Sequence, residues 1–217
     1  MNDTEDFYAP RRCLREPIPE IFFAANLLDQ AVDAHLSGDH TIAEALIRAA
    51  DIPEVGQWVD SLWGSAKNHP NQAKYLRVRT IEGAPPTVPK QDRIKERMPS
   101  ASERRMIVER WGYNCAFCGI PVIRKEVRCR MRKAYPNALR WGSQNAKQHA
   151  AFQCLWLQYD HIVPHARGGG NDPSNIIVTC SGCNYGKGNY VLAEQGLMDP
   201  RQRSINKTNW DGLERFV

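Results

Sequence analysis

Two Cys-x-x-Cys pairs are the most distinctive chemical feature of the sequence. They are Cys115 with Cys118, and Cys180 with Cys183. Each pair places two thiolates on a tight turn, and four thiolates can surround Zn²⁺ in a closed tetrahedral site that has no position for a reacting water. Ordinary buried cysteines are the competing interpretation, but two independent pairs would have to coincide. The sequence therefore predicts a structural zinc site. Ordinary thiols are expected for the other cysteines, Cys13, Cys129 and Cys154.

A second group of polar side chains lies between and just after these pairs: Asp160, His161, Asn175 and Asn184. A neutral imidazole, with an ordinary pKa of about 6.5, can accept a proton near neutral pH. A carboxylate together with an amide oxygen is the hard-oxygen ligation that suits Mg²⁺ or Mn²⁺. Taken singly, these residues have simpler explanations, namely a surface turn, an Asx turn and a helix cap. Their joint order between the cysteine pairs favours catalysis.

The order of these residues resembles the motif of the HNH endonucleases in its zinc-bound form. The stretch DHIVP at 160–164 is followed by GGGNDPSNIIVTCSGCN at 168–184, and the resemblance spans about residues 115–195. It implies an α+β fold with a ββα-metal core and a nuclease that hydrolyses phosphodiester bonds, in double-stranded DNA first of all. It also implies a role in bacterial defence against foreign DNA. An RNA substrate, or a zinc knuckle that binds nucleic acid without catalysis, remains an alternative.

The resemblance also implies a role for each polar residue of the motif. His161 matches the general base that activates the attacking water. Asp160 and Asn184 match the ligands of one catalytic Mg²⁺ or Mn²⁺ ion. Asn175 matches the middle asparagine, which holds the loop and so orients His161.

Local patterns predict the elements that position these residues. Residues 155–163 alternate as a strand, the glycines at 168–170 make a turn, and residues 176–179 form a second, β-branched strand. Asn184 is expected to open a helix that runs through Leu192 and Ala193. Lys187 would then lie near the start of this helix, where its ammonium and the helix dipole both attract a phosphate. A solvated lysine is the commoner explanation for any one such residue.

The 41 residues between Cys118 and Asp160 form a basic insert at 119–159, which is long for the family. It carries eight basic side chains and one acid, Glu126. Such a density of positive charge is typical of phosphate contact, although a solvated helical face is the simpler alternative. Nearby aromatic rings could stack on bases or belong to the core. The candidate phosphate contacts are Arg124, Lys125, Arg128, Arg130, Arg132 and Lys133.

The first 81 residues predict a small all-helical region. Helices are expected at 19–36, 41–50 and 54–63, the last with an apolar face that ends at Trp63. Four prolines and the run KQDRIKERM make residues 82–99 a linker. Residues 100–217 then form the nuclease domain, which opens with a helix capped at Ser100 or Ser102. The helical region could dock a protein partner, and Trp210 and Leu213 in the tail are expected to pack back onto the domain.

Charge and hydropathy restrict the class of protein. The net charge is +5, but residues 99–217 carry 17 basic and 9 acidic side chains, whereas residues 1–98 carry 12 and 15. No run approaches the roughly 18 apolar residues of a membrane helix, and the acidic start MNDTEDF is unlike a signal peptide. In a reducing compartment, two Cys-x-x-Cys pairs indicate metal binding rather than a disulfide framework. We expect a soluble, cytoplasmic protein with no membrane partner.

Overall fold

The computed structural model describes residues 9–62 and 74–217. Trp63 and the acidic start of the chain lie outside these ranges. Three helices come first along the chain: α2 (Pro19–Leu36), α3 (His40–Ala49) and α4 (Pro53–Asp60). Pro19 and Pro53 lie in the first turn of their helices, where a missing backbone N–H breaks no helical hydrogen bond. The three expected helices are therefore present, and α2 has the predicted bounds.

Helix α5 (Ala101–Trp111) begins at the cap that the sequence predicted. The Ser100 hydroxyl accepts a hydrogen bond from the Glu103 N–H, and the Glu103 carboxylate accepts one from the Ser100 N–H. Gly112, with φ of 70°, ends the helix. The insert contains α6 (Lys125–Ala134) and α7 (Ala150–Cys154). Short 3-10 turns occur at η2 (Lys90–Asp92), η3 (Asn145–Lys147), η4 (His165–Arg167), η5 (Leu192–Gln195), η6 (Pro200–Gln202) and η7 (Glu214–Phe216).

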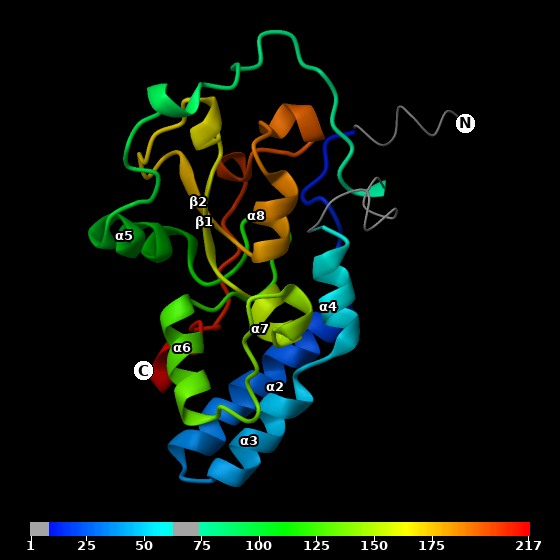
Figure 1. Ribbon diagram of the computed structural model, residues 1–217, viewed down its shortest axis with the longest axis vertical. Helices are drawn as coiled ribbons and strands as arrows, with labels where there is room; N and C mark the ends of the chain where they lie inside the picture. The colour runs from blue at the N-terminus through cyan, green and yellow to red at the C-terminus, as the bar shows by residue number, and fades with distance from the viewer. Residues whose placement is uncertain (1–8, 63–73) are drawn as a thin grey trace.

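Two antiparallel strands form the centre of the predicted nuclease domain. Strand β1 (Gln158–His161) pairs with β2 (Ile176–Thr179), so that Gln158 faces Thr179 and His161 faces Ile176. β2 has the predicted bounds, whereas β1 is shorter than expected. In Figure 1 the hairpin lies between α5 and α8 (Ser181–Lys187), and α5 packs on β2 while α8 packs on β1. Strand, strand and helix thus follow in the order of a ββα unit.

The start of α8 differs from the prediction. Cys180 caps the helix, because its sulfur accepts a hydrogen bond from the Cys183 N–H, and Asn184 is therefore the fourth helical residue rather than the first. Gly188, with φ of 56°, ends the helix directly after Lys187. Leu192 and Ala193 belong to the separate turn η5. Lys187 consequently lies at the C-terminal end of α8, so the expected help from a helix N-terminus does not apply.

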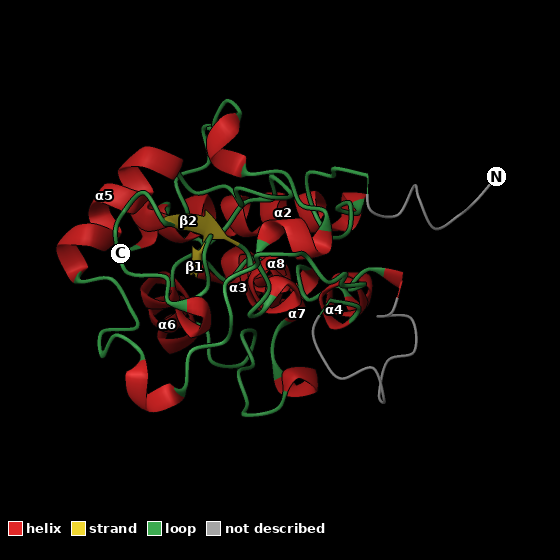
Figure 2. Cartoon of the chain, turned by 90° about the horizontal axis from the view of Figure 1, so that it is seen from above, coloured by secondary structure: helices red, strands yellow, loops and turns green. Residues whose placement is uncertain are grey.

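The helical region and the ββα unit share one hydrophobic core. Helix α4 packs against α7 and α8, which lie near it in Figure 2, and α2 packs against α7 and η7. Trp58 of α4 and Ile177 of β2 are fully buried in the same cluster. Leu213 is also buried there, and Trp210 Nε1 donates to the Val122 carbonyl at 2.9 Å, which confirms that the tail packs back onto the domain. Packing does not separate the two predicted regions.

None of the helices in the described ranges is both long and apolar enough to cross a lipid bilayer.

Candidate active site and zinc centre

The four predicted zinc ligands meet in space. The sulfur atoms of Cys115, Cys118, Cys180 and Cys183 all lie within 4.8 Å of one another, and Cys118 Sγ is 3.8 Å from Cys180 Sγ. Tetrahedral Zn²⁺ with Zn–S bonds of about 2.3 Å requires sulfur atoms about 3.8 Å apart, so the cluster fits this ion. One pair lies on the turn after α5 and the other at the start of α8. The cluster therefore joins the end of α5 to the end of the hairpin.

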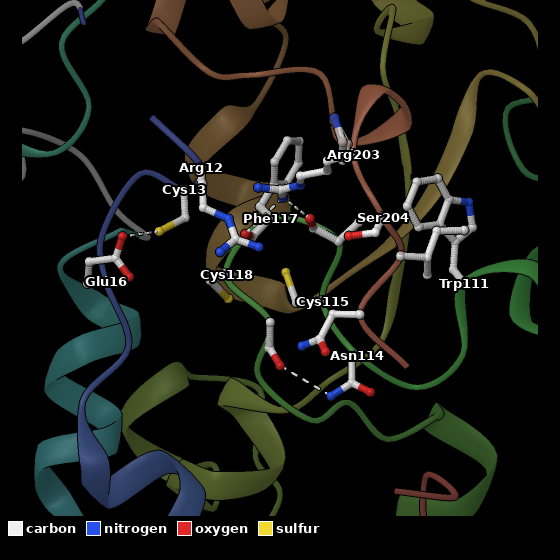
Figure 3. A pocket seen from close by; sticks show the side chains of 15 residues that line it. Arg12, Cys13, Glu16, Trp111, Asn114, Cys115, Phe117, Cys118, Arg203 and Ser204 are labelled. Atoms are coloured by element: carbon white, nitrogen blue, oxygen red, sulfur yellow. Dashed lines mark hydrogen bonds between the residues drawn. The ribbon is translucent and has the colours of Figure 1, made fainter. Parts of the chain in front are cut away.

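The thiols of the cluster interact closely, and their pKa values move apart: that of Cys115 is lowered, whereas burial and hydrogen bonds with the other thiols raise those of Cys118 and Cys183 well above the ordinary value. Burial opposes ionisation of Cys115, but hydrogen bonds from the other three thiols lower its pKa well below the ordinary value. Figure 3 shows Cys115 and Cys118 beside a small pocket that Arg12 and Arg203 also line. The Arg203 guanidinium donates to the carbonyls of Ala116 and Phe117, so a positive charge is fixed near the thiolates. Cys13 instead donates to the Glu16 carboxylate at 3.3 Å.

His161 lies at the end of β1 and lines a groove of about 670 Å³. Its Nε2 is 2.9 Å from Asn171 Oδ1, and Asn171 Nδ2 donates to the Glu96 carbonyl at 2.7 Å. The second bond fixes the amide so that its oxygen faces the imidazole, and an amide oxygen can only accept. The proton of a neutral His161 is therefore on Nε2, and Nδ1 carries the lone pair. Burial, followed by neighbouring positive charges, lowers the pKa of His161 below its ordinary value.

Asn175 holds the loop between the two strands. Its side chain accepts from the Val163 N–H at 2.9 Å and donates to the carbonyls of Val163 and Gly170. Gly169 packs so closely here that an added Cβ would collide with the Val163 carbonyl. The residue that touches His161 directly is Asn171, to which the sequence analysis gave no role. Its place in the loop, two residues after the centre of the glycine turn, gives no local signal for this contact.

Asp160 and Lys187 form a buried ion pair. Lys187 Nζ lies 3.1 Å from Asp160 Oδ1, and the lysine side chain is 0% exposed. Burial raises the pKa of Asp160 to about 6, although the positive charge of Lys187 acts in the opposite direction. A fully enclosed ammonium does not reach a phosphate at the surface. The prediction that Lys187 contacts a phosphate is thus wrong. Lys187 is instead the internal partner of Asp160.

The residues predicted to hold a divalent ion line the same groove as His161. Asp160 and Asn184 both contribute to its wall. The second carboxylate oxygen of Asp160, Oδ2, is buried and accepts no hydrogen bond from any described residue. A desolvated carboxylate oxygen without a partner costs free energy, and a hard cation would relieve that cost. The residues present therefore fit a Mg²⁺ or Mn²⁺ ion.

The basic residues of the insert divide into engaged and exposed groups. Arg128 is 5% exposed, and its guanidinium lies 3.6 Å and 4.7 Å from the ring centroids of Trp141 and Trp156. It is a structural cation–π contact rather than the expected phosphate contact. Arg124 forms an ion pair with Glu214 of the tail. The exposed members are Lys125, Arg130, Arg132 and Lys133.

The segment that the sequence predicted to be a linker takes part in the site. Val88 N–H donates to the Ala166 carbonyl at 2.8 Å, and His165 Nε2 lies 2.8 Å from the Ile94 carbonyl. Lys95 and Arg97 of this segment line the groove of His161. The sequence predicted no site role for these residues, because the prolines and the charged run at 90–98 are typical of an extended linker.

Comparison with known proteins agrees with this geometry. Residues 151–198 match the family model of the HNH endonucleases. The match covers His161, both motif asparagines and the second cysteine pair, whereas Cys115 and Cys118 lie before it. Searches of the curated proteins and of the solved structures gave no match to the chain. The resemblance is thereby confirmed: within 151–198 the chain carries the motif of HNH endonucleases, a family of nucleic-acid hydrolases.

Proposed function

We propose that this protein is a metal-dependent endonuclease that hydrolyses phosphodiester bonds in DNA, with His161 as the general base. The observation that carries the proposal is the state of His161. Its imidazole lines an open groove, and the Asn171 amide fixes the tautomer that leaves Nδ1 free to accept a proton. A lowered pKa keeps this imidazole neutral at physiological pH.

In the proposed reaction, His161 Nδ1 takes a proton from a water molecule in the groove. The water oxygen then forms a new bond to phosphorus while the bond from phosphorus to the leaving sugar oxygen breaks, and a proton from solvent completes the sugar hydroxyl. Asn175 supports this step indirectly, since it holds the loop that carries Asn171. The chain thus supplies the base, its orientation and the groove that receives the backbone.

Asp160 and Asn184 would hold one Mg²⁺ or Mn²⁺ ion in this groove. When bound, such an ion neutralises charge on the scissile phosphate and stabilises the leaving oxygen. Lys187 fixes the Asp160 carboxylate through Oδ1 and leaves Oδ2 free. The four cysteines would hold Zn²⁺ as a purely structural ion, because four thiolates leave no position for water.

The test is incubation of the purified protein with plasmid DNA and with RNA of mixed sequence, with Mg²⁺ or Mn²⁺ and with EDTA. We expect metal-dependent cleavage of the plasmid and none in EDTA. Cleavage of RNA but not of plasmid would identify RNA, rather than DNA, as the substrate. Binding of DNA without cleavage of either polymer, under every metal condition, would favour a zinc knuckle that only binds nucleic acid.

The resemblance extends this proposal to bacterial defence against foreign DNA. Survival of phage challenge by cells that produce the wild-type protein, compared with His161→Ala, tests that role. Docking of a protein partner on the helical region stays a prediction.

A further inference from the structure

A second groove adjoins the groove of His161, and we propose that it carries the DNA strand onward from the scissile phosphate. This inference rests on the proposed function and adds the path of the substrate. Basic side chains of residues 95–105 and of the first turn of α6 would hold successive phosphates along this path. Both of these basic segments lie outside the residues that match the HNH family.

The two grooves lie side by side and share part of their lining. The first, of about 670 Å³, contains His161, and the second, of about 560 Å³, lies between α5 and the start of α6. Met98, Gln158 and Tyr159 line both grooves. Gln158 and Tyr159 belong to β1, so the strand that ends at His161 also forms the wall shared by the two grooves. A backbone seated at His161 can therefore continue along β1 into the second groove.

Positive charge dominates the walls of both grooves. The basic side chains are Lys90, Arg93, Lys95, Arg97, Arg104, Arg105, Arg124 and Lys125. The acidic side chains are Asp160, Glu109 and Glu126. The ion pairs among the described residues involve Arg124 but not Lys95, Arg97 or Arg105, which are exposed. Their charges are available to phosphates, and Asp160 has Lys187 as its own partner.

The basic segment is held in place by hydrogen bonds with the loop between the two strands. Asn171 binds the Glu96 carbonyl, His165 binds the Ile94 carbonyl, and Arg104 Nε donates to the Pro99 carbonyl at 2.9 Å. The backbone around Lys95 and Arg97 is therefore attached to the same residue that orients His161. A backbone fixed in advance loses less conformational freedom when a ligand binds. This arrangement suits a strand that must lie in one register relative to the base.

The second groove also offers flat rings to the strand. Tyr159 and Trp156 line it, and the Arg104 guanidinium lies 5.7 Å from the centroid of the Tyr159 ring. A mixture of cations and aromatic rings is typical of surfaces that follow a nucleic-acid backbone and bind its bases. By contrast, Arg130, Arg132 and Lys133 on the rest of α6 line neither groove. Within α6, contact with the strand is thereby restricted to the first turn.

The test is a salt titration of binding to a short, fluorescein-labelled DNA duplex, made in the non-cleaving His161→Ala background. The groove variant combines Lys95→Gln, Arg97→Gln and Arg105→Gln. The matched control combines Arg130→Gln, Arg132→Gln and Lys133→Gln, which removes the same charge from α6. We expect the groove variant to bind about tenfold or more weakly, and the slope of log affinity against log salt to flatten by about 0.9 for each phosphate that the variant no longer neutralises. The control should keep a slope close to that of the parent.

An unchanged slope in the groove variant, or an equal change in the control, would overturn the proposal. Zinc content and melting temperature of both variants verify that each is folded. The test is separate from that of the proposed function. If the wild type cleaves no nucleic acid, the proposed nuclease activity is rejected, but the proposed DNA path along the second groove is not. If the wild type cleaves but the salt slope of the groove variant is unchanged, the proposed DNA path is rejected, but the nuclease activity is not.

Discussion

The cysteine cluster and the His161 centre occupy opposite ends of one short hairpin. They differ in whether their polar atoms already have partners within the protein. Cys180 follows the Thr179 end of β2, next to Gln158, whereas His161 faces Ile176 at the other end. Helix α8 begins at the cluster, and its Asn184 and Lys187 reach the His161 end. The cluster is closed by four equivalent ligands. The His161 centre keeps a free imidazole nitrogen and a carboxylate oxygen without a hydrogen bond from the described residues.

Stability and chemistry are thus separated within the same small unit. A closed site contributes free energy of folding and offers nothing to a substrate. An open site keeps reactive atoms at some cost in stability. Changes at the cluster should therefore alter folding, and changes at His161 should alter cleavage alone.

Loss of one of the four proposed zinc ligands should have the largest effect. Cys180→Ser should abolish zinc binding and unfold the ββα unit, because a four-thiolate zinc site contributes on the order of 10 kcal/mol to folding. Zinc content and thermal unfolding followed by circular dichroism measure this. Cys129→Ser, at an exposed thiol, is the matched control and should behave as wild type. A folded Cys180→Ser protein that still lacks zinc would show that the cluster is not required for the fold.

Removal of the Lys187 ammonium should cause the second largest loss of stability. Lys187→Met leaves the buried Asp160 carboxylate without its partner, which costs about 3–5 kcal/mol of unfolding free energy. Urea denaturation at neutral pH measures the decrease. Adding Asp160→Asn to Lys187→Met should recover part of the stability, since the uncompensated charge is then gone. Equal stability of Lys187→Met and wild type would mean that the ion pair contributes nothing.

Removal of the base should affect cleavage and leave folding intact. His161→Ala should lower the cleavage rate by a factor of about 10² or more, because a positioned general base contributes roughly that much. Its zinc content and melting temperature should match those of wild type. In the wild type, cleavage should fall only below about pH 6.5, since burial lowers the pKa of His161 and the neutral base persists to lower pH. A wild-type rate in the mutant would remove His161 from the mechanism.

The smallest effect is expected at Asn171. Asn171→Ala removes the hydrogen bond that fixes the His161 tautomer, and one such bond is worth about 1 kcal/mol, or roughly a fivefold decrease in cleavage rate. The decrease should appear in kcat rather than KM, and unfolding should change little. Asn137→Ala, on the exposed turn after α6, is the control. An Asn171 variant with an unchanged kcat would show that Asn175 and the loop alone orient the base.

Local chemistry in the sequence was sufficient for much of the fold and for the core of the site. The bounds of α2 and β2, the Ser100 cap and the meeting of four cysteines all follow from signals within a few residues or from pair spacing. The family motif placed Asp160, His161 and Asn184 together, and the structure brings all three to one groove. Each of these features depends on propensity, capping or ligand spacing, which neighbouring residues determine.

Only the tertiary structure decided which charges face the solvent and which face the protein. Lys187 is paired inside with Asp160, Arg128 lies against the rings of two tryptophans, and Asn171 binds both His161 and Glu96. The segment at 90–98 resembles a spacer by composition, but its backbone binds the loop that orients His161. These hydrogen bonds and ion pairs join residues far apart in the sequence. A charged side chain looks the same in sequence whether its partner is water, a phosphate or a buried carboxylate, because that choice depends on what the fold packs against it.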